Sequence, residues 1–155
     1  MSDNLQAELK QRKPFPRVTA EALVSVLRTA AVLEHQMTEV LKPLGITHTQ
    51  YNALRILRGA GENGLCGREV AERLVSRVPD VSRLLDRMED TGLIGRERNP
   101  GDRRHVTARI TPKGLAMLDQ ATPKLEAVER ARFGRVPARR LQELLDLLAG
   151  VRGNP

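Results

Sequence analysis

Apolar residues recur at intervals of three and four positions over a long stretch that begins at Val18. The members of this stripe are Leu23, Val26, Leu27, Ala30, Leu33, Met37, Val40 and Leu41. Their spacing follows the turn of an α-helix, so we expect one amphipathic helix of roughly 24 residues, closed by Gly45. A stripe of that length needs more covering surface than one small domain readily supplies.

Shorter amphipathic segments follow in the middle of the chain, separated by turn residues. Thr47 and Gln50 form a capping box that starts a second helix. The apolar positions of this helix are Tyr51, Leu54, Ile56 and Leu57. A third, short helix is expected over residues 67–74, and a fourth over residues 79–91, with a proline at its first position and Gly92 as its stop.

A β-hairpin is expected after the fourth helix. Residues 93–98 and 106–110 alternate partly between apolar and polar side chains, and an Asn-Pro-Gly-Asp turn joins them. Residues 47–111 therefore order as helix, short helix, helix and hairpin. This is the layout of a winged helix-turn-helix, in which the second helix of the turn enters the DNA major groove and the hairpin, or wing, flanks it. The fold class is mainly α (α+β), with a two-stranded wing.

Helical segments flank this DNA-binding region on both sides. Residues 112–150 begin with a helix that we expect Pro123 to kink or interrupt before it resumes to Phe133. The last helix begins at Pro137 and carries the leucine stripe Leu141, Leu144, Leu145 and Leu148. Because both terminal stripes need a partner, we expect residues 18–46 and 112–150 to form a homodimerisation region. Residues 1–17 are expected to be a flexible arm.

Composition favours duplex DNA as the partner. The 155-residue chain is 40% hydrophobic, enough for one core, and has 26 Lys+Arg against 19 Asp+Glu, a net charge of +7. That sign favours nucleic acid. An aromatic content of 2% leaves little on which single-stranded bases could stack, so double-stranded DNA is the better interpretation.

Several other classes of protein are disfavoured by what the sequence lacks. One cysteine excludes an intramolecular disulfide framework and a Cys-rich zinc site, and no apolar run of transmembrane or signal-peptide length occurs. No nucleotide-binding glycine loop, Ser-His-Asp arrangement or metal triad is visible. We therefore expect a cytoplasmic protein that is not an enzyme, has no metal or cofactor, and does not bind membranes.

The polar face of the 79–91 helix supplies the candidate base-reading residues. Ser82 and Arg83 lie in its first turns, where such helices approach base edges, and Asp80 either accepts a hydrogen bond from cytosine or orients Arg83. Arg77 and Arg87 are candidates for phosphate contacts. The alternative is a solvated face on which Arg83 and Arg87 pair with neighbouring acids.

Positive charge is also concentrated in the hairpin. The arginines there are Arg96, Arg98, Arg103, Arg104 and Arg109, opposed within the hairpin by Glu97 and Asp102. The tip can insert an arginine into the minor groove while Asp102 holds the guanidinium, although the same pair could simply staple the turn. A winged helix that binds proteins and not DNA is the alternative function, and it predicts a neutral wing.

The chain resembles the MarR family, the multiple-antibiotic-resistance regulators, over residues 18–149. Residues 102–114 fit the family's wing signature of Asp-x-Arg followed by aliphatic-Thr-x-x-Gly, and residues 81–94 resemble its recognition helix and strand entry. Residues 45–54 and 68–74 fit the two preceding helices. The resemblance implies a homodimeric regulator, expected to be a repressor, on a pseudo-palindromic operator. It also implies release by a small, often phenolic or aromatic, effector or by thiol oxidation.

Candidate switch residues follow from that resemblance. His35, His48, Tyr51 and Arg55 lie on helices that would line an effector cleft, although both histidines could equally be ordinary surface or core residues. Cys66 precedes the third helix, with Glu69 three residues on, where a helix N-terminus favours the thiolate. Thiol-based sensing through Cys66 is thus an alternative to its being a poor cap. The family's oxidation sensors carry their cysteine near the first helix, which here has none.

Overall fold

The computed structural model describes the backbone of residues 3–153, and their side chains except those of residues 3, 4, 99 and 102–105. The helices are α1 (Asp3–Glu8), α2 (Val18–Leu41), α3 (His48–Ala60), α4 (Gly67–Arg73), α5 (Val81–Asp90), α6 (Pro112–Phe133) and α7 (Ala138–Val151). The strands are β1 (Leu65–Cys66), β2 (Ile94–Asn99) and β3 (Asp102–Ile110), and two short 3-10 turns are η1 (Lys42–Leu44) and η2 (Gly61–Asn63). The expected fold class, mainly helical with a winged helix-turn-helix, is confirmed.

The wing belongs to a three-stranded antiparallel sheet of order β1-β3-β2. The expected two-stranded wing is formed by β2 and β3, and the sequence analysis missed the third strand, whose Leu65 and Cys66 pair with Ala108 and Thr107 of β3. A strand of two residues is too short to show a period in the sequence. Gly64 leads into it with a φ of +64°, and a Cβ there would lie 2.5 Å from the Ala108 carbonyl oxygen, so only glycine fits.

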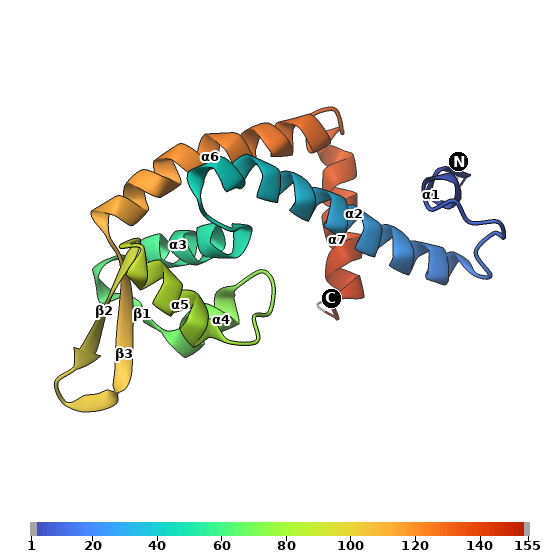
Figure 1. Ribbon diagram of the computed structural model, residues 1–155. Helices are drawn as coiled ribbons and strands as arrows, with labels where there is room; N and C mark the ends of the chain where they lie inside the picture. Colours follow the sequence, from blue (N-terminus) through green and yellow to red (C-terminus); the bar gives the residue numbers. More distant parts are fainter. Residues whose placement is uncertain (1–2, 154–155) are drawn as a thin grey trace.

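One core joins the winged-helix region to the two long helices. The largest fully buried side chains are Leu41, Leu54, Leu57, Val70, Met88, Ile94 and Leu118. They come from α2, α3, α4, α5, β2 and α6, and all belong to one hydrophobic cluster. Figure 1 shows α2 and α6 running side by side above this cluster, with the wing projecting from the opposite end of the molecule.

The helix boundaries follow local capping chemistry. The first long helix spans Val18–Leu41 as predicted, with η1 between it and Gly45, which has a φ of +73°. The expected capping box is confirmed: Thr47 Oγ1 accepts the Gln50 N–H at 3.1 Å, and the Thr47 N–H donates to Gln50 Oε1 at 3.0 Å.

The structure corrects two predictions at prolines: the expected start of the fourth helix was wrong, and the helix around Pro123 is not interrupted. The fourth helix begins at Val81 and not at Pro79, because Asp80 is extended and caps the helix with its side chain. Pro123 lies inside an unbroken α6. The missing N–H is tolerated there because the flanking side chains of Leu118, Ala121 and Leu125 are buried in the core.

The ends of the chain carry further differences. A short helix, α1, lies inside the segment expected to be a flexible arm, where the run Leu-Gln-Ala-Glu is rich in helix-favouring residues. Its Glu8 carboxylate lies 3.9 Å from Arg28 Nε of α2. The last helix runs to Val151, one residue beyond the expected stop at Gly150.

Apolar side chains remain uncovered on both terminal helices. On α2, Leu27 is 61% exposed, and on α7, Leu147 is 70% exposed. Other large exposed apolar residues of these helices are Val18, Leu23, Val26, Leu144, Leu145 and Val151. No helix in the described part of the chain combines the length and hydropathy needed to span a bilayer.

Candidate nucleic-acid interface

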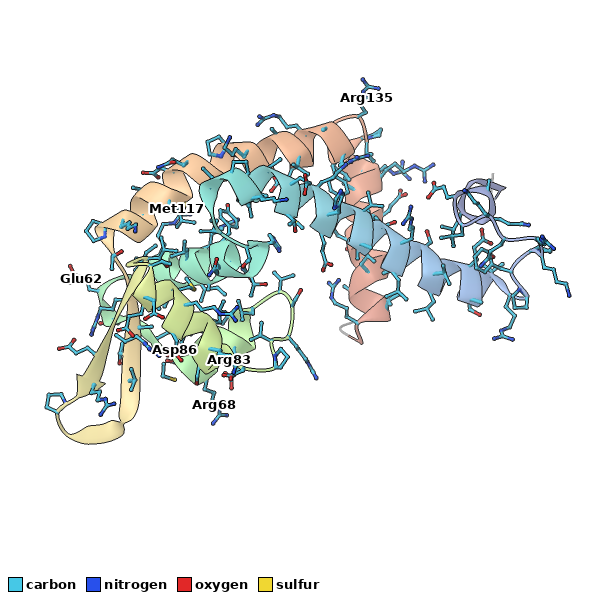
Figure 2. The ribbon with its side chains drawn as sticks, in the orientation of Figure 1. Glu62, Arg68, Arg83, Asp86, Met117 and Arg135 are labelled. Atoms are coloured by element: carbon cyan, nitrogen blue, oxygen red, sulfur yellow. The ribbon has the colours of Figure 1, made fainter. Side chains whose placement is uncertain are left out.

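The interface is built on α5, whose two faces differ in character. Leu85 and Met88 are buried in the core on one face. On the other face Ser82, Arg83 and Arg87 are exposed, and Figure 2 shows the side chain of Arg83 on this helix. The helix-turn-helix packing of α4 against α5 thus holds this polar face toward solvent.

Asp80 organises the first turn of α5. Its Oδ1 accepts the backbone N–H of Arg83 at 3.0 Å, so the carboxylate caps the helix at the residue expected to read bases. Within the described side chains, neither Arg83 nor Arg87 forms an ion pair, and both guanidinium groups are exposed. Asp80, Arg83 and Arg87 line one open groove of about 350 Å³ together with Thr47 and Thr49 of the α3 N-terminus.

The remaining predicted DNA-binding residues lie around this groove or on the wing. Arg77 is exposed on the segment that joins α4 to α5, and Arg98 is exposed on β2. Asp102, Arg103 and Arg104 begin β3, where Asp102 pairs with Asn99 at the turn, but their side chains lie outside the described residues. The structure therefore brings together the α5 residues and leaves the contacts of the wing tip as predictions.

Two wing arginines have partners that the sequence did not reveal. Arg96 Nε donates to Glu89 Oε2 at 2.8 Å, and its Nη2 lies 2.5 Å from Asp86 Oδ1, both acids being on α5. The hydrogen bond to Glu89 is the main reason that the pKa of Arg96 is raised. Beyond the two acids expected within the hairpin, Arg96 therefore has partners from another element.

Arg109 anchors the other side of the sheet. Its Nη1 lies 2.8 Å from Glu97 Oε2, and its Nε donates to the carbonyl oxygen of Glu62 at 2.6 Å. Figure 2 shows Glu62 beside the base of the wing. Arg109 thus ties β3 to the turn that precedes β1. A pairing of this kind joins residues far apart in sequence, and periodicity carries no signal for it.

A separate pocket of about 200 Å³ lies between α2, α3 and α6. Three of the four predicted effector-binding residues, His48, Tyr51 and Arg55, line it, and the rings of His48 and Tyr51 stack with centroids 6.5 Å apart. Burial lowers the pKa of His48, and the charge of Glu34 partly opposes that shift. Tyr51 is buried, and its hydroxyl lies 3.3 Å from Thr122 Oγ1 of α6.

His35 does not line this pocket. Leu33 and Met37 of α2 face it, and His35 lies between them on the opposite side of the helix. There it lines a different groove, with Lys124 and Arg132 of α6. The structure therefore does not bring His35 and His48 together in one pocket. A residue that the sequence analysis missed is Asn52, which lines the pocket and whose Oδ1 accepts the Val75 N–H at 2.9 Å.

Cys66 occupies the N-cap position of α4 and is partly exposed. Its backbone N–H donates to Glu69 Oε2 at 2.9 Å, which lowers the pKa of Glu69. This bond fulfils half of a capping box. Across the part of the chain that the structure describes, no group of three His, Cys, Asp or Glu residues is placed to hold a metal ion.

A helix-turn-helix with an exposed basic face beside a β-wing defines a class of transcriptional regulators. Residues 44–105 match the model of the MarR family. An HTH-type transcriptional repressor of Mycobacterium tuberculosis is 32% identical over 112 residues, which cover 72% of this chain and 76% of that protein. The chain belongs to the MarR family of transcriptional regulators.

Solved structures of the family share the fold. A MarR family transcriptional regulator from Streptomyces coelicolor, in complex with DNA, aligns with a TM-score of 0.74 and 25% identity over 92% of this chain and 91% of that chain. CouR from Rhodococcus jostii, bound to p-coumaroyl-CoA, aligns with a TM-score of 0.71 over 88% of this chain and 95% of that chain. At 22% identity, the likeness to CouR concerns the fold alone.

Proposed function

We propose that this protein is a transcriptional repressor that binds a pseudo-palindromic operator in duplex DNA as a homodimer and is released by a small-molecule effector. The observation that carries the proposal is the α5 face, on which Arg83 and Arg87 are exposed and unpaired among the described side chains. A cationic helix face held by a rigid core suits insertion into a major groove.

The contacts that we assign follow from position on that face. Ser82 and Arg83, one turn or less from the helix start, read base edges, and Arg77 and Arg87 bind phosphates. On the wing, Arg98, Arg103 and Arg104 approach the neighbouring minor groove, with Asp102 holding one of the guanidinium groups. Asp80 acts through the cap that it forms on Arg83.

The exposed apolar faces of α2 and α7 support the homodimer. A monomer would leave Leu27, Leu145 and Leu147 in water, and a second copy of the chain with the same stripes can cover them. A two-fold dimer would set its two α5 helices about 34 Å apart, which matches one turn of B-form DNA. Sedimentation of the purified protein, with Leu145→Glu as the disrupting variant, tests this step.

The pocket lined by His48, Tyr51 and Arg55 is the effector site that we propose, for a small aromatic or phenolic molecule. Apolar side chains from α2 and α6 form part of its walls, and Arg55 offers a charged group for an acidic substituent. The Asn52 side chain in this pocket accepts the N–H of Val75, which lies in the segment that carries Arg77 and leads into α5. A ligand there would therefore act close to the DNA-reading helix.

The test is selection of bound duplex fragments from the source genome, followed by affinity measurements at several salt concentrations. We expect tight binding that weakens steeply with salt, and Arg83→Ala should both weaken it and relax the preference at particular bases. Arg135→Ala is the matched control, because Arg135 is exposed at the end of α6 far from α5 (Figure 2). A winged helix devoted to protein binding would show no salt-dependent affinity for any fragment, and that result would overturn the proposal.

A further inference from the structure

A cluster of one cation and two carboxylates lies where the base of the wing meets α5, and the DNA contacts assigned above do not use it. Arg96 Nη2 lies 2.5 Å from Asp86 Oδ1 and 2.6 Å from Glu89 Oε2. Its Nε also donates to Glu89 at 2.8 Å. Arg96 belongs to β2 and both acids to α5, so the cluster joins the wing to the helix proposed to read DNA.

We propose that Arg96 is a positioning residue for DNA binding: it neutralises Asp86 and Glu89 and locks the wing against α5, without contacting DNA itself. This inference rests on the proposed DNA-binding function and deepens it. The charge of Arg96 is thus used by two acids of α5.

The guanidinium group of Arg96 is already engaged within the protein. The Arg96 side chain is only 23% exposed, and two of its nitrogens are already engaged by carboxylates. Charge-assisted hydrogen bonds of this kind fix the orientation of the guanidinium plane. A phosphate would have to displace both carboxylates to reach the same nitrogens. Arg83 and Arg87, exposed and without such partners in the described part of the chain, are better placed for that role.

The two acids lie on the helix proposed to read DNA. Asp86 directly precedes Arg87 on α5, and its side chain is 53% exposed on the wing side of the helix (Figure 2). Glu89 is 38% exposed. Because their oxygens contact one nitrogen, two negative charges lie close together near the surface that would face phosphates. Without the cation between them, they would repel each other and the DNA.

Arg96 also lies at the connection between α5 and the wing. The hairpin leaves α5 through Gly92, which has a φ of +75°, and projects away from the core. In the described part of the chain, Arg96 is the residue of β2 or β3 that forms ion pairs with α5. Those pairs set the angle between wing and helix, and that angle must match the spacing of adjacent DNA grooves.

The experiment compares three variants: Arg96→Ala, the double variant Asp86→Asn with Glu89→Gln, and the triple variant that combines them. The probe is the tightest-binding genomic duplex from the selection above, and fluorescence anisotropy gives Kd between about 50 and 200 mM salt. We expect Arg96→Ala to weaken binding at least about tenfold, since it uncovers two charges and frees the wing. We expect the triple variant to bind at least about threefold more tightly than Arg96→Ala, because residues in one ion-pair network couple to this degree or more.

The salt dependence separates positioning from a direct contact. Loss of a phosphate contact lowers the slope of log Kd against log salt by about one, so Arg87→Ala should show that change and Arg96→Ala should not. A triple variant that stays as weak as Arg96→Ala, or a slope for Arg96→Ala that falls by about one, would overturn the inference. Arg96→Lys, which keeps the charge without the planar fork, should fall between wild type and Arg96→Ala.

Separate measurements distinguish a folding defect, failure of the proposed function and failure of the role of Arg96. Thermal unfolding identifies any variant that fails to fold. If Arg96→Ala fails to fold, Arg96→Lys replaces it, both alone and combined with Asp86→Asn and Glu89→Gln. Failure of the wild-type protein to bind any duplex would refute the proposed function. Normal wild-type binding with no rescue in the triple variant would refute only the role of Arg96.

Discussion

Asp80 offers the sharpest separation between a structural role and base reading at the start of α5. Its carboxylate accepts the backbone N–H of Arg83 at 3.0 Å and is the N-cap of the helix. Replacement by alanine leaves that N–H without its partner, which costs about 1 kcal/mol, within a range of about 0.5–2 kcal/mol. For a chain of this size, each kcal/mol lowers Tm by roughly 2–4 °C.

The same change should weaken operator binding. In Asp80→Ala the first turn of α5 would be less ordered in the free protein, so DNA binding would have to order it. A cost of about 1 kcal/mol corresponds to roughly a fivefold change in an equilibrium constant. We therefore expect Asp80→Ala to lower Tm by a few degrees and to raise Kd by up to about fivefold. Differential scanning fluorimetry and anisotropy with the genomic duplex measure both quantities.

Two replacements keep the cap and change the chemistry offered to bases. Serine and asparagine cap helices about as well as aspartate, so Asp80→Ser and Asp80→Asn should retain both Tm and affinity. Asp90→Ala is the control at the other end of α5, where an exposed acid caps nothing. An unchanged Tm in Asp80→Ala would refute the capping argument. Loss of preference at one base pair in Asp80→Ser, with a normal Tm, would show instead that the carboxylate reads cytosine.

Two further predictions concern pH and packing. Burial holds the pKa of His48 below its ordinary value, so on acidification the unfolded chain takes up a proton before the folded protein does. The free energy of unfolding should therefore fall as pH drops below about 6.5 and level off below the folded-state pKa. Urea midpoints from pH 8 to 5 should show a smaller slope in His48→Gln, and equal slopes would contradict the assignment. Gly114→Ala should destabilise the protein by about 1–3 kcal/mol, because a Cβ there would overlap the Leu93 carbonyl oxygen. Gly59→Ala, in open space on α3, is the control in urea unfolding and should be neutral or stabilising.

The predictions that succeeded were those based on strong local signals. The long stripe from Val18 predicted α2 because a helix of that length repeats its period many times. The capping box of Thr47 and Gln50 is a local hydrogen-bond motif, and its residues alone define it. The Asn-Pro-Gly-Asp turn likewise predicted the hairpin formed by β2 and β3.

The failures have a common physical cause, which is that tertiary contacts override or add to local preference. Pro123 disfavours a helix locally, yet burial of the α6 face keeps the helix whole. At the start of α5, two signals competed, and the side-chain cap of Asp80 prevailed over proline at the first position. Strand β1 exists only through its pairing with β3.

The candidate site was predictable as a list of residues and not as a set of contacts. Arg83 and Arg87 lie on the exposed face that the period of α5 implies. The ion-pair partners of Arg96 come from a different element, so the hairpin sequence alone suggested that this arginine was available to bind DNA. His35 lies on the same helix as the pocket residues Leu33 and Met37 but on a different face, and it therefore lines another groove.

The single hydrophobic core limits how this regulator can be altered by recombination. Leu41 of α2 and Leu118 of α6 are packed in the same cluster as Leu54 and Met88, so residues 47–111 cut out alone would lose a wall of their own interior. We therefore expect that residues 47–111 cannot be fused alone to an unrelated sensor domain, as a domain on a flexible linker could be. Any gene fusion that borrows its specificity must carry both long helices with it.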